Sequence, residues 1–285
     1  MKRLGFDIGS TTMKCVLTNE QGEILFSDYR RHMAKISETA LEMLDEIKEH
    51  YGDEPVGAAV SGSAGMGIAE KLSLPFVQEV YAEKLAVERL SPGTDAVIEL
   101  GGEDAKILFL TGGFEMRMNG TCAGGTGAFI DQMASLMKIS PDEMNDLARD
   151  RQSPCVIASR CGVFAKSDIQ PLLNQGVRRE DIAAGIFKAV VNQTIAGLAQ
   201  GRSIRGNILY LGGPLTFLSE LRASFDESLE TKGVCPQNSL YYVALGAACS
   251  GIFKEITVNG LQSLFKNSLK PAGYAHTPPL FESKE

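Results

Sequence analysis

Short stretches in which apolar and polar residues alternate recur along the first part of the chain, and turns rich in Gly and polar residues separate them. The first three stretches are Arg3 to Ile8, Met13 to Leu17 and Ile24 to Tyr29, and this alternation predicts three strands. The same plan of strand, turn, strand, turn and strand returns from Ala96 to Met118. The pattern therefore predicts two copies of one three-stranded unit.

The two strand groups keep the same register. Three residues of the first group have a counterpart of the same type 92 positions later: Asp7 and Glu99, Gly9 and Gly101, Lys14 and Lys106. This register predicts a duplicated fold, although two unrelated β-meanders are the alternative. We expect a first half over residues 1–92, a second half over residues 93–255, and a C-terminal extension or linker over residues 256–285.

Helical periodicity follows each strand group. Ile36 to Glu49 places its apolar residues on one face, and Arg179 to Gln200 does so over a longer stretch. Ser140 begins a further predicted helix as a capping box, with Pro141 at the first helical position and Glu143 three residues after the cap. Strands followed by helices, twice over, predict an α/β protein of two domains around a cleft.

Composition narrows the range of functions. The 285 residues include 28 Lys and Arg against 35 Asp and Glu, a formal charge of -7, which is the wrong sign for binding a nucleic-acid backbone. The longest apolar runs are far shorter than the ~20 residues that span a bilayer, and the N-terminus lacks the core of a signal peptide. We expect a cytoplasmic protein that binds neither nucleic acid nor membrane.

Two polar turns, one in each half, have the composition of phosphate-binding loops. Small residues let backbone N–H groups approach phosphate oxygens, hydroxyls add donors, and a lysine can reach a phosphate as a point charge. The residues concerned are Gly9, Ser10, Thr11, Thr12 and Lys14 in the first half and Gly101, Gly102 and Glu103 in the second. Because the halves are expected to face each other, both turns are expected at one cleft.

Acidic residues beside these turns are candidates for catalysis. Asp7 and Glu99 end the two first strands, where a hydrated Mg²⁺ would find the one or two carboxylates that it usually takes. Asp104 is a further candidate for holding the ion or orienting a water. After the apolar stretch Asn207 to Leu211, the turn Gly212-Gly213-Pro214 would let an adenosine lie against the backbone. Neither a Walker A loop nor a G-x-G-x-x-G fingerprint matches these turns.

Two of the six cysteines stand out. Cys122 and Cys161 have small or polar neighbours, and Cys122 precedes a predicted helix whose N-terminus favours a thiolate. The alternative is that both are ordinary buried thiols. With three His and no C-x-x-C pair in the chain, two thiolates cannot complete a four-ligand iron–sulfur site. A twofold dimer that places both pairs on its axis would supply four.

Four motifs occur together in this chain: Phe6 to Thr12, Glu99 to Lys106, Asn119 to Gly127 and Arg160 to Phe164. Together they resemble the ATP-dependent activators of 2-hydroxyacyl-CoA dehydratases and the related ATPase subunits of benzoyl-CoA reductase. The resemblance extends from about Leu4 to Ser250. It implies the duplicated ribonuclease-H-like fold of the actin and sugar-kinase superfamily, in agreement with the repeat.

The resemblance also implies a mechanism and partners. Members of this family are homodimers that share one [4Fe-4S] cluster, and the matching ligands here would be Cys122 and Cys161. They couple ATP hydrolysis to the delivery of a low-potential electron to a dehydratase- or reductase-type Fe–S partner, and receive electrons from a donor such as ferredoxin or flavodoxin. ATP or ADP with Mg²⁺ would bind at the turns described above, with Asp7 and Glu99 serving the ion.

Some positions depart from the short members of that family. Glu103 stands where they usually have Gln, Ser61 to Gly65 replaces a motif with an aromatic residue and an Arg, and Pro214-Leu215 replaces Val-Ala. These variants are similar to the N-terminal module of very long fused members, in which the partner is a domain of the same chain. Lys270 to Glu285 is then expected to be a linker.

Two other functions are compatible with the same superfold. A kinase of the sugar or acetate type would need a substrate-binding acid or base in the cleft, and it leaves the surroundings of Cys122 and Cys161 unexplained. A non-redox binding module switched by ATP would need an extended interaction surface, which the sequence does not reveal.

Overall fold

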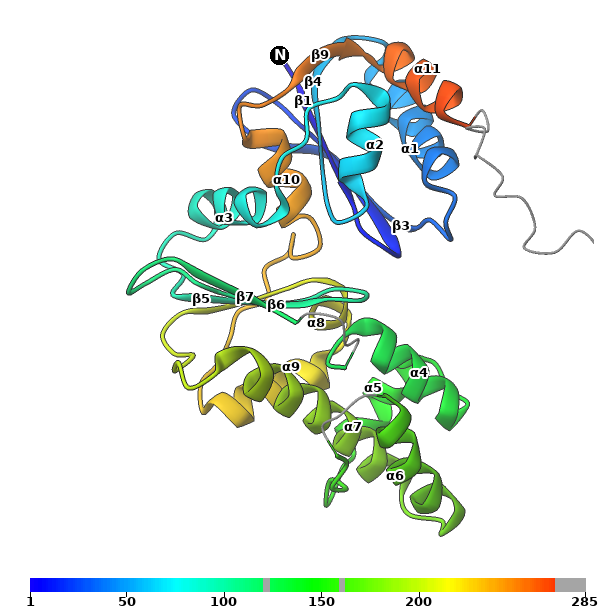
Figure 1. The fold of residues 1–285 in the computed structure, drawn as a ribbon, viewed down its shortest axis with the longest axis vertical. Coiled ribbons are helices and arrows are strands. Elements are labelled where there is room, and N and C mark those ends of the chain that lie inside the picture. Colours follow the sequence, from blue (N-terminus) through cyan, green and yellow to red (C-terminus); the bar gives the residue numbers. More distant parts are fainter. Residues whose placement is uncertain (120–123, 159–161, 270–285) are drawn as a thin grey trace, which may run out of the picture.

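Two β-sheets, one in each half, organise the computed structural model, which describes residues 1–119, 124–158 and 162–269 (Figure 1). The first sheet has five strands, in the spatial order β3 (Ile24–Arg31), β2 (Thr12–Thr18), β1 (Arg3–Ile8), β4 (Pro55–Ser61) and β9 (Lys254–Thr257). Its central strand β1 is antiparallel to β2 and parallel to β4. The predicted strand–turn–strand unit at the N-terminus is confirmed.

The second sheet repeats this plan. Its strands lie in the order β7 (Glu115–Met118), β6 (Ala105–Phe109), β5 (Ala96–Leu100) and β8 (Ile208–Leu211). Here β5 is antiparallel to β6 and parallel to β8, as β1 is to β2 and β4. The register is also the same, because Asp7 pairs with Lys14 and Glu99 pairs with Lys106. The chain therefore contains two copies of one α/β unit.

Helices complete the first half from both ends of the chain. They are α1 (Ile36–Tyr51), α2 (Gly65–Leu72) and α11 (Val258–Ser268), and Figure 1 shows them grouped beside the first sheet. Met43 and Leu44 of α1 and Leu261 and Phe265 of α11 are buried in one core with this sheet. The stretch from residue 256, expected as an extension, thus starts inside β9 and includes α11, so the described part of it belongs to the first half.

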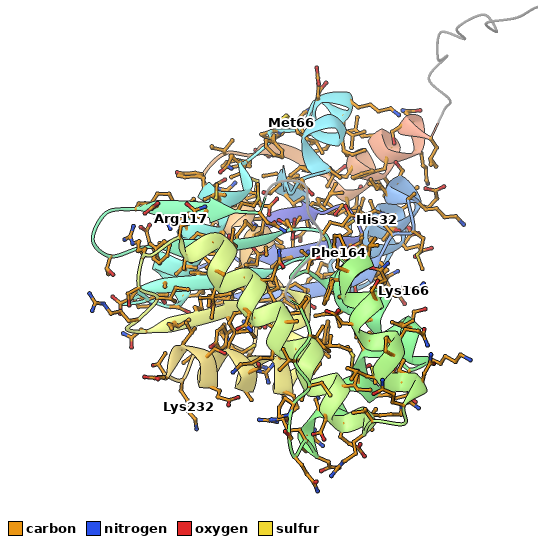
Figure 2. All side chains as sticks on the ribbon, turned by 60° about the horizontal axis from the view of Figure 1, so that its bottom comes forward. His32, Met66, Arg117, Phe164, Lys166 and Lys232 are labelled. Atoms are coloured by element: carbon orange, nitrogen blue, oxygen red, sulfur yellow. The ribbon has the colours of Figure 1, made fainter. Side chains whose placement is uncertain are left out.

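The second half carries most of the other helices. They are α4 (Gly127–Met137), α5 (Pro141–Arg149), α6 (Gly162–Asn174), α7 (Arg179–Thr194), α8 (Gly213–Phe217) and α9 (Ser219–Leu229). The capping box predicted at α5 is present, since Ser140 Oγ accepts from the Glu143 N–H and the Glu143 carboxylate accepts from the Ser140 N–H. A π-helical turn, Ile195–Ala199, ends α7, and Arg117 of β7 donates to its last carbonyls (Figure 2).

Two further helices, α3 (Glu79–Leu90) and α10 (Tyr242–Cys249), lie between the two sheets (Figure 1). Val80 and Val87 of α3 and Leu245 of α10 share an apolar cluster with strands of both halves. The two helices touch closely at Gly246, where a Cβ would lie 1.7 Å from the Ala82 carbonyl oxygen. A larger residue at Gly246 would push the helices apart, so this glycine helps to set how the halves meet.

One helical stretch in the described part of the chain, Arg179–Ala199, is long and apolar enough to cross a membrane. Its most apolar window is 67% buried inside the protein. Ile182, Ile186 and Val190 pack in the core of the second half. Its composition is therefore that of a core helix.

Candidate nucleotide site

A cavity of about 360 Å³ lies between the two halves and is bordered by the predicted turns of both. Nine of the candidate residues line it: Thr11, Thr12, Lys14, Glu99, Gly101, Gly102, Gly212, Gly213 and Pro214. The other described candidates are close in sequence but do not border the cavity: Asp7, Gly9, Ser10, Glu103 and Asp104. The structure thus brings the three glycine-containing turns to one cleft.

The first turn holds an acid and a lysine at its base. Asp7, at the end of β1, is 6% exposed, and its Oδ2 lies 3.0 Å from Nζ of Lys14 on the neighbouring strand. Burial lowers the pKa of Lys14, but the charge of Asp7 and the contact with it outweigh burial and raise the pKa. Lys14 therefore stays a cation at the wall of the cavity, where it can meet a phosphate.

The second turn has the same pair within a larger cluster. Nζ of Lys106 lies 2.5 Å from Glu99 Oε2 and also pairs with Glu79 of α3. Glu83 Oε2 and Asp104 Oδ2 lie 3.7 Å and 3.9 Å from the same nitrogen. Lys106 is 1% exposed and Glu83 is fully buried. Four carboxyl groups thus surround one buried ammonium, and two of them come from α3.

Burial and mutual repulsion set the ionisation of this cluster. Burial lowers the pKa of Lys106, but the charges of Glu99, Glu83, Glu79 and Asp104 together raise it well above its ordinary value. Burial raises the pKa of Glu83 well above its usual range, and the charge of Glu99 adds to the rise. One ammonium cannot neutralise four carboxylates, and burial together with the Glu99 charge favours the protonated form of Glu83. Neither oxygen of Glu83 has a hydrogen-bond partner among the described residues.

The two phosphate turns touch each other and the start of α4. A Cβ at Gly102 would lie 2.3 Å from Thr11 Oγ1, so the turns approach as closely as glycine allows. The N–H groups of Gly127 and Ala128, at the start of α4, donate to the carbonyl oxygens of Gly101 and Gly102 at 2.9 and 2.8 Å. The N-terminus of α4 is therefore fixed directly to the second phosphate turn.

The third turn depends on a glycine. Gly212 has φ of 84° and is the N-cap residue of α8, and Pro214 lies in the first turn of that helix. A Cβ at Gly212 would lie 2.1 Å from the Leu100 carbonyl oxygen, so β5 and this turn are in direct backbone contact. Only glycine fits both the positive φ and this approach, and the turn is thereby held at the cavity wall.

Side chains from both halves also meet across the cavity. Arg31, at the end of β3, lies 3.3 Å from Asp131 of α4, and the rings of Tyr29 and Phe217 meet edge to face with centroids 5.8 Å apart. All four residues line the cavity. The sequence motifs do not include these four residues, because no local pattern shows that they face each other across the cavity.

The donor set at the strand ends fits Mg²⁺ bound mainly by a nucleotide. Asp7 and Glu99 supply two carboxylates, and each already has a lysine partner. The described residues contain no group of three or more His, Cys, Asp or Glu placed to hold a metal ion. Mg²⁺ usually keeps several waters and takes one or two carboxylates beside phosphate oxygens. Asp7 and Glu99 would hold such an ion directly or through water.

The candidate cluster ligands Cys122 and Cys161 lie outside the described residues. The described chain resumes after them at Gly124 and Gly162, and the helices that follow, α4 and α6, contact each other. A Cβ at Gly162 would lie 2.1 Å from Gln132 Oε1 of α4. Of the other cysteines, Cys15 is fully buried, and Cys155, Cys235 and Cys249 are half-buried thiols.

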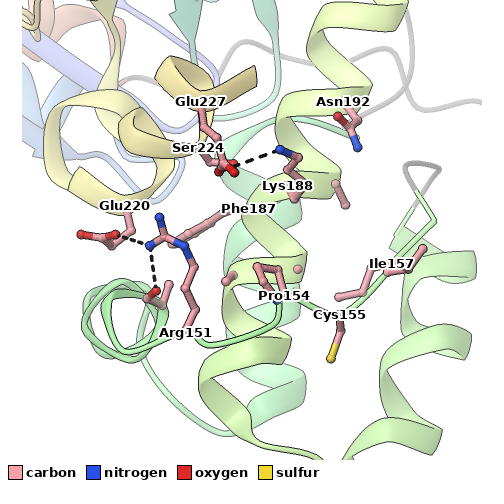
Figure 3. A pocket seen from close by; sticks show the side chains of 15 residues that line it. Arg151, Pro154, Cys155, Ile157, Phe187, Lys188, Asn192, Glu220, Ser224 and Glu227 are labelled. Atoms are coloured by element: carbon pink, nitrogen blue, oxygen red, sulfur yellow. Dashed lines mark hydrogen bonds and ion pairs between the residues drawn. The ribbon is translucent and has the colours of Figure 1, made fainter. Parts of the chain in front are cut away.

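A second hollow, of about 330 Å³, lies in the second half between α5, α7 and α9 (Figure 3). Arg151 pairs there with Glu220 at 2.8 Å, and Lys188 lies 3.9 Å from Glu227. Each of these cations already has an acidic partner, so this hollow is poorly suited to a phosphate. The cleft between the halves is the better candidate site.

Known proteins are similar in sequence to this chain over most of its length. The chain is 27% identical over 248 residues to the (R)-2-hydroxyglutaryl-CoA dehydratase activating ATPase of Acidaminococcus fermentans, which covers 86% of this chain and 95% of that relative. The solved structure of component A of that organism's (R)-2-hydroxyglutaryl-CoA dehydratase superposes with a TM-score of 0.79 at 25% identity, covering 92% of this chain and 99% of the other.

A second solved structure has the same fold. It is the activator of the 2-hydroxyisocaproyl-CoA dehydratase from Clostridium difficile with bound ADPNP, with a TM-score of 0.74, 23% identity and coverage of 97% and 100%. The predicted duplicated fold of the actin and sugar-kinase superfamily is confirmed. The sequence model of one ATPase family matches residues 4–251. Because this match covers most of the chain, including the three turns at the cleft, the chain belongs to the BadF/BadG/BcrA/BcrD ATPase family.

Proposed function

We propose that this chain hydrolyses Mg·ATP in the cleft and uses hydrolysis to activate a partner protein by passing an electron to it. Three glycine-containing turns and a buried acid–lysine pair at the cavity support nucleotide binding. Membership of an ATPase family supports hydrolysis. The activator role rests on the relatives, whose names describe dehydratase activation.

The residues at the cavity have different proposed roles in binding the nucleotide and its metal ion. Lys14 binds a phosphate oxygen, and Thr11 and Thr12 donate from the first turn. Asp7 and Glu99 hold Mg²⁺ and its waters, and the Gly212-Gly213-Pro214 turn receives the adenosine. Asp104 lies in the buried cluster and away from the cavity lining. We therefore assign it to stabilising the second turn, where its carbonyl oxygen accepts from the Gly101 N–H at 2.8 Å.

The observation that carries the proposal is the bond between the second turn and α4. Gly127 and Ala128 donate to Gly101 and Gly102, and Cys122 lies five residues before Gly127 in the sequence. A movement of the turn on hydrolysis would therefore be passed to the start of α4, which follows Cys122 in the sequence. Differential binding of ATP and ADP by two shapes of the protein would supply the energy.

Cys122 and Cys161 of two copies of the chain would hold one [4Fe-4S] cluster, which supplies one-electron chemistry. The partner would be a dehydratase- or reductase-type Fe–S protein or a fused domain. A donor such as ferredoxin or flavodoxin would return the electron. The role of the chain itself is to bind nucleotide, to change shape and to present the cluster.

Metal analysis after purification without oxygen tests the redox part. We expect about four irons and four sulfides per dimer, lost in Cys122→Ser and Cys161→Ser and retained in Cys249→Ser, a matched change at a half-buried thiol. Iron-free protein after anaerobic reconstitution would refute the redox role.

Hydrolysis is tested separately with Asp7→Ala. We expect this variant to lose Mg·ATP hydrolysis, because Asp7 pairs with Lys14 at the cavity wall, and to keep its iron, because Asp7 is not one of the proposed cluster ligands. Turnover equal to that of the wild type would remove Asp7 from the assigned role.

A further inference from the structure

The connection between β3 and α1 has an unusual backbone. Met33 and Ala34 are consecutive residues with positive φ, 46° and 62°, a region that residues with a Cβ rarely adopt. The four other described residues of this kind each end a helix, where a left-handed residue is ordinary. They are Ser73, Lys138, Gln200 and Glu230. The positive φ angles of Met33 and Ala34 are therefore not explained by a helix end.

That turn folds around His32, which lies at its start and is 4% exposed (Figure 2). The N–H of Ala34 donates to Nδ1 of His32 at 3.2 Å, and the N–H of Lys35 donates to the His32 carbonyl oxygen at 2.6 Å. The left-handed residues bring these two donors back onto the histidine. Since Nδ1 accepts, the ring hydrogen sits on Nε2.

The ring and backbone of His32 both reach the first phosphate turn. Nε2–H donates to the Gly9 carbonyl oxygen at 3.0 Å, and the His32 N–H donates to the Thr11 carbonyl oxygen at 3.2 Å. The turn also closes on itself through the Gly9 N–H and the Thr12 carbonyl oxygen at 2.9 Å. Two carbonyls of the turn are thus held from outside by one buried residue.

Holding these carbonyls orients the N–H groups of the turn. In a trans peptide the C=O and the following N–H point in opposite directions. With the Gly9 and Thr11 oxygens facing His32, the N–H groups of Ser10 and Thr12 point away from it. Of these two residues Thr12 lines the cavity and Ser10 does not, so the bonds to His32 hold the backbone of Thr12 at the cavity wall before the nucleotide binds.

We infer that His32, held in place by the strained Met33-Ala34 turn, is a positioning residue that keeps the first phosphate turn ready to bind the nucleotide phosphates. The inference rests on the proposed nucleotide function of the cleft. His32 does not touch the cavity itself. It acts through Gly9 and Thr11, and the strain of the turn is retained because it places the ring.

The test compares His32→Ala with His32→Gln in the full chain. Binding of Mg·ATP and of adenosine is measured, together with KM and kcat. His32→Ala loses the bond to Gly9 and is expected to weaken Mg·ATP binding about tenfold, the effect of roughly one hydrogen bond, and to raise KM more than it lowers kcat. His32→Gln keeps an N–H donor near the Nε2 position and should recover most of the affinity. Adenosine, which has no phosphate, should bind both variants as it binds the wild type.

His50→Ala is the matched control, because His50 lies at the exposed end of α1, where its Nδ1 meets the Glu46 carbonyl oxygen at 2.8 Å and its ring lies beside that of Tyr51. It should bind Mg·ATP like the wild type. Equal Mg·ATP affinity in His32→Ala and wild type would overturn the inference, as would an equal loss for adenosine, which would indicate general damage to the cleft. If the wild type itself binds no Mg·ATP, the proposed function fails and not the role of His32 alone.

Discussion

The acid–lysine pair of the first half and that of the second occupy the same register but different surroundings. Lys14 retains 16% of its side-chain exposure, pairs with Asp7 and borders the cavity. Lys106 is 1% exposed, has carboxyl groups on several sides and does not border the cavity. The two lysines thus occupy equivalent positions in the two copies of the unit. Their surroundings differ, so that Lys14 lies at the wall of the cavity and Lys106 lies buried in the scaffold.

The helices between the sheets explain the difference. Against the first sheet, α10 presents small residues, and a Cβ at Gly5 of β1 would lie 2.0 Å from the Ala244 carbonyl oxygen. Toward the second sheet, α3 presents Glu79 and Glu83, which both reach Lys106. The first pair therefore stays open to the cleft, and the second becomes an ionic connection between α3 and the second sheet.

Replacing Lys106 should have the largest effect. Lys106→Met leaves several buried carboxyl groups without their cation, and breaking a buried ionic network in this way costs about 3–5 kcal/mol. Chemical denaturation should show this loss in the free energy of unfolding. The matched change Lys14→Met should cost clearly less; equal losses from the two variants would remove the distinction between scaffold and ligand lysine.

Lys14→Met should instead act on the ligand. A charge-assisted hydrogen bond to phosphate contributes about 1.5–3 kcal/mol, so the dissociation constant for Mg·ATP should rise roughly 10–100-fold. Isothermal titration of the folded variant measures this change. Wild-type affinity in Lys14→Met would show that the first lysine, like the second, serves only the scaffold.

The Glu83→Gln variant tests whether Glu83 in the second cluster carries a proton. Burial, and then the Glu99 charge, raise the pKa of Glu83 above its ordinary 4.5, so the folded state holds a proton that the unfolded state loses above about pH 4.5. Stability of the wild type should fall by about 1.4 kcal/mol per pH unit from this group over that window. Gln copies the protonated form and should remove this fall, measured by denaturation without Mg²⁺ or nucleotide. Glu79, Glu99 and Lys106 face residue 83 in both proteins. If the free energy of unfolding changes with pH equally in the variant and the wild type, Glu83 is ionised in the folded wild type.

The contact between Arg31 and Asp131 should matter least for stability. Their side chains are 56% and 42% exposed, and exposed ion pairs contribute about 0.2–1 kcal/mol. Arg31→Ala should therefore shift the free energy of unfolding by less than about 1 kcal/mol, with a smaller shift at high salt. A loss as large as that of Lys106→Met would show that this surface pair, and not the buried cluster, connects the halves.

Local pattern was sufficient to predict the strands, their register and the convergence of three turns. Alternation located β1 to β3 and β5 to β7, and the spacing of 92 located both acid–lysine pairs. That spacing identifies Lys106 as the counterpart of Lys14. The burial of Lys106 could not be predicted, since it depends on where α3 packs.

Contacts between distant segments were beyond the sequence. Glu79 and Glu83 are four residues apart, so they share one helix face, but the sequence does not show that this face meets the second sheet. The sequence did not predict that β9 and α11 belong to the first half, because the local sequence of a short strand does not show which strand it pairs with. The local sequence of His32 likewise does not show that its ring reaches the first phosphate turn.

We propose that nucleotide in the cleft acts on the start of α4, which follows Cys122 in the sequence. Hydrogen–deuterium exchange of the anaerobic protein, with and without Mg·ADPNP, measures this coupling at the N–H groups of Gly127 and Ala128. We predict slower exchange at these two groups together with the Gly9–Thr12 turn, and no change in α11. Protection of the turn with unchanged exchange at Gly127 and Ala128 would contradict the claim.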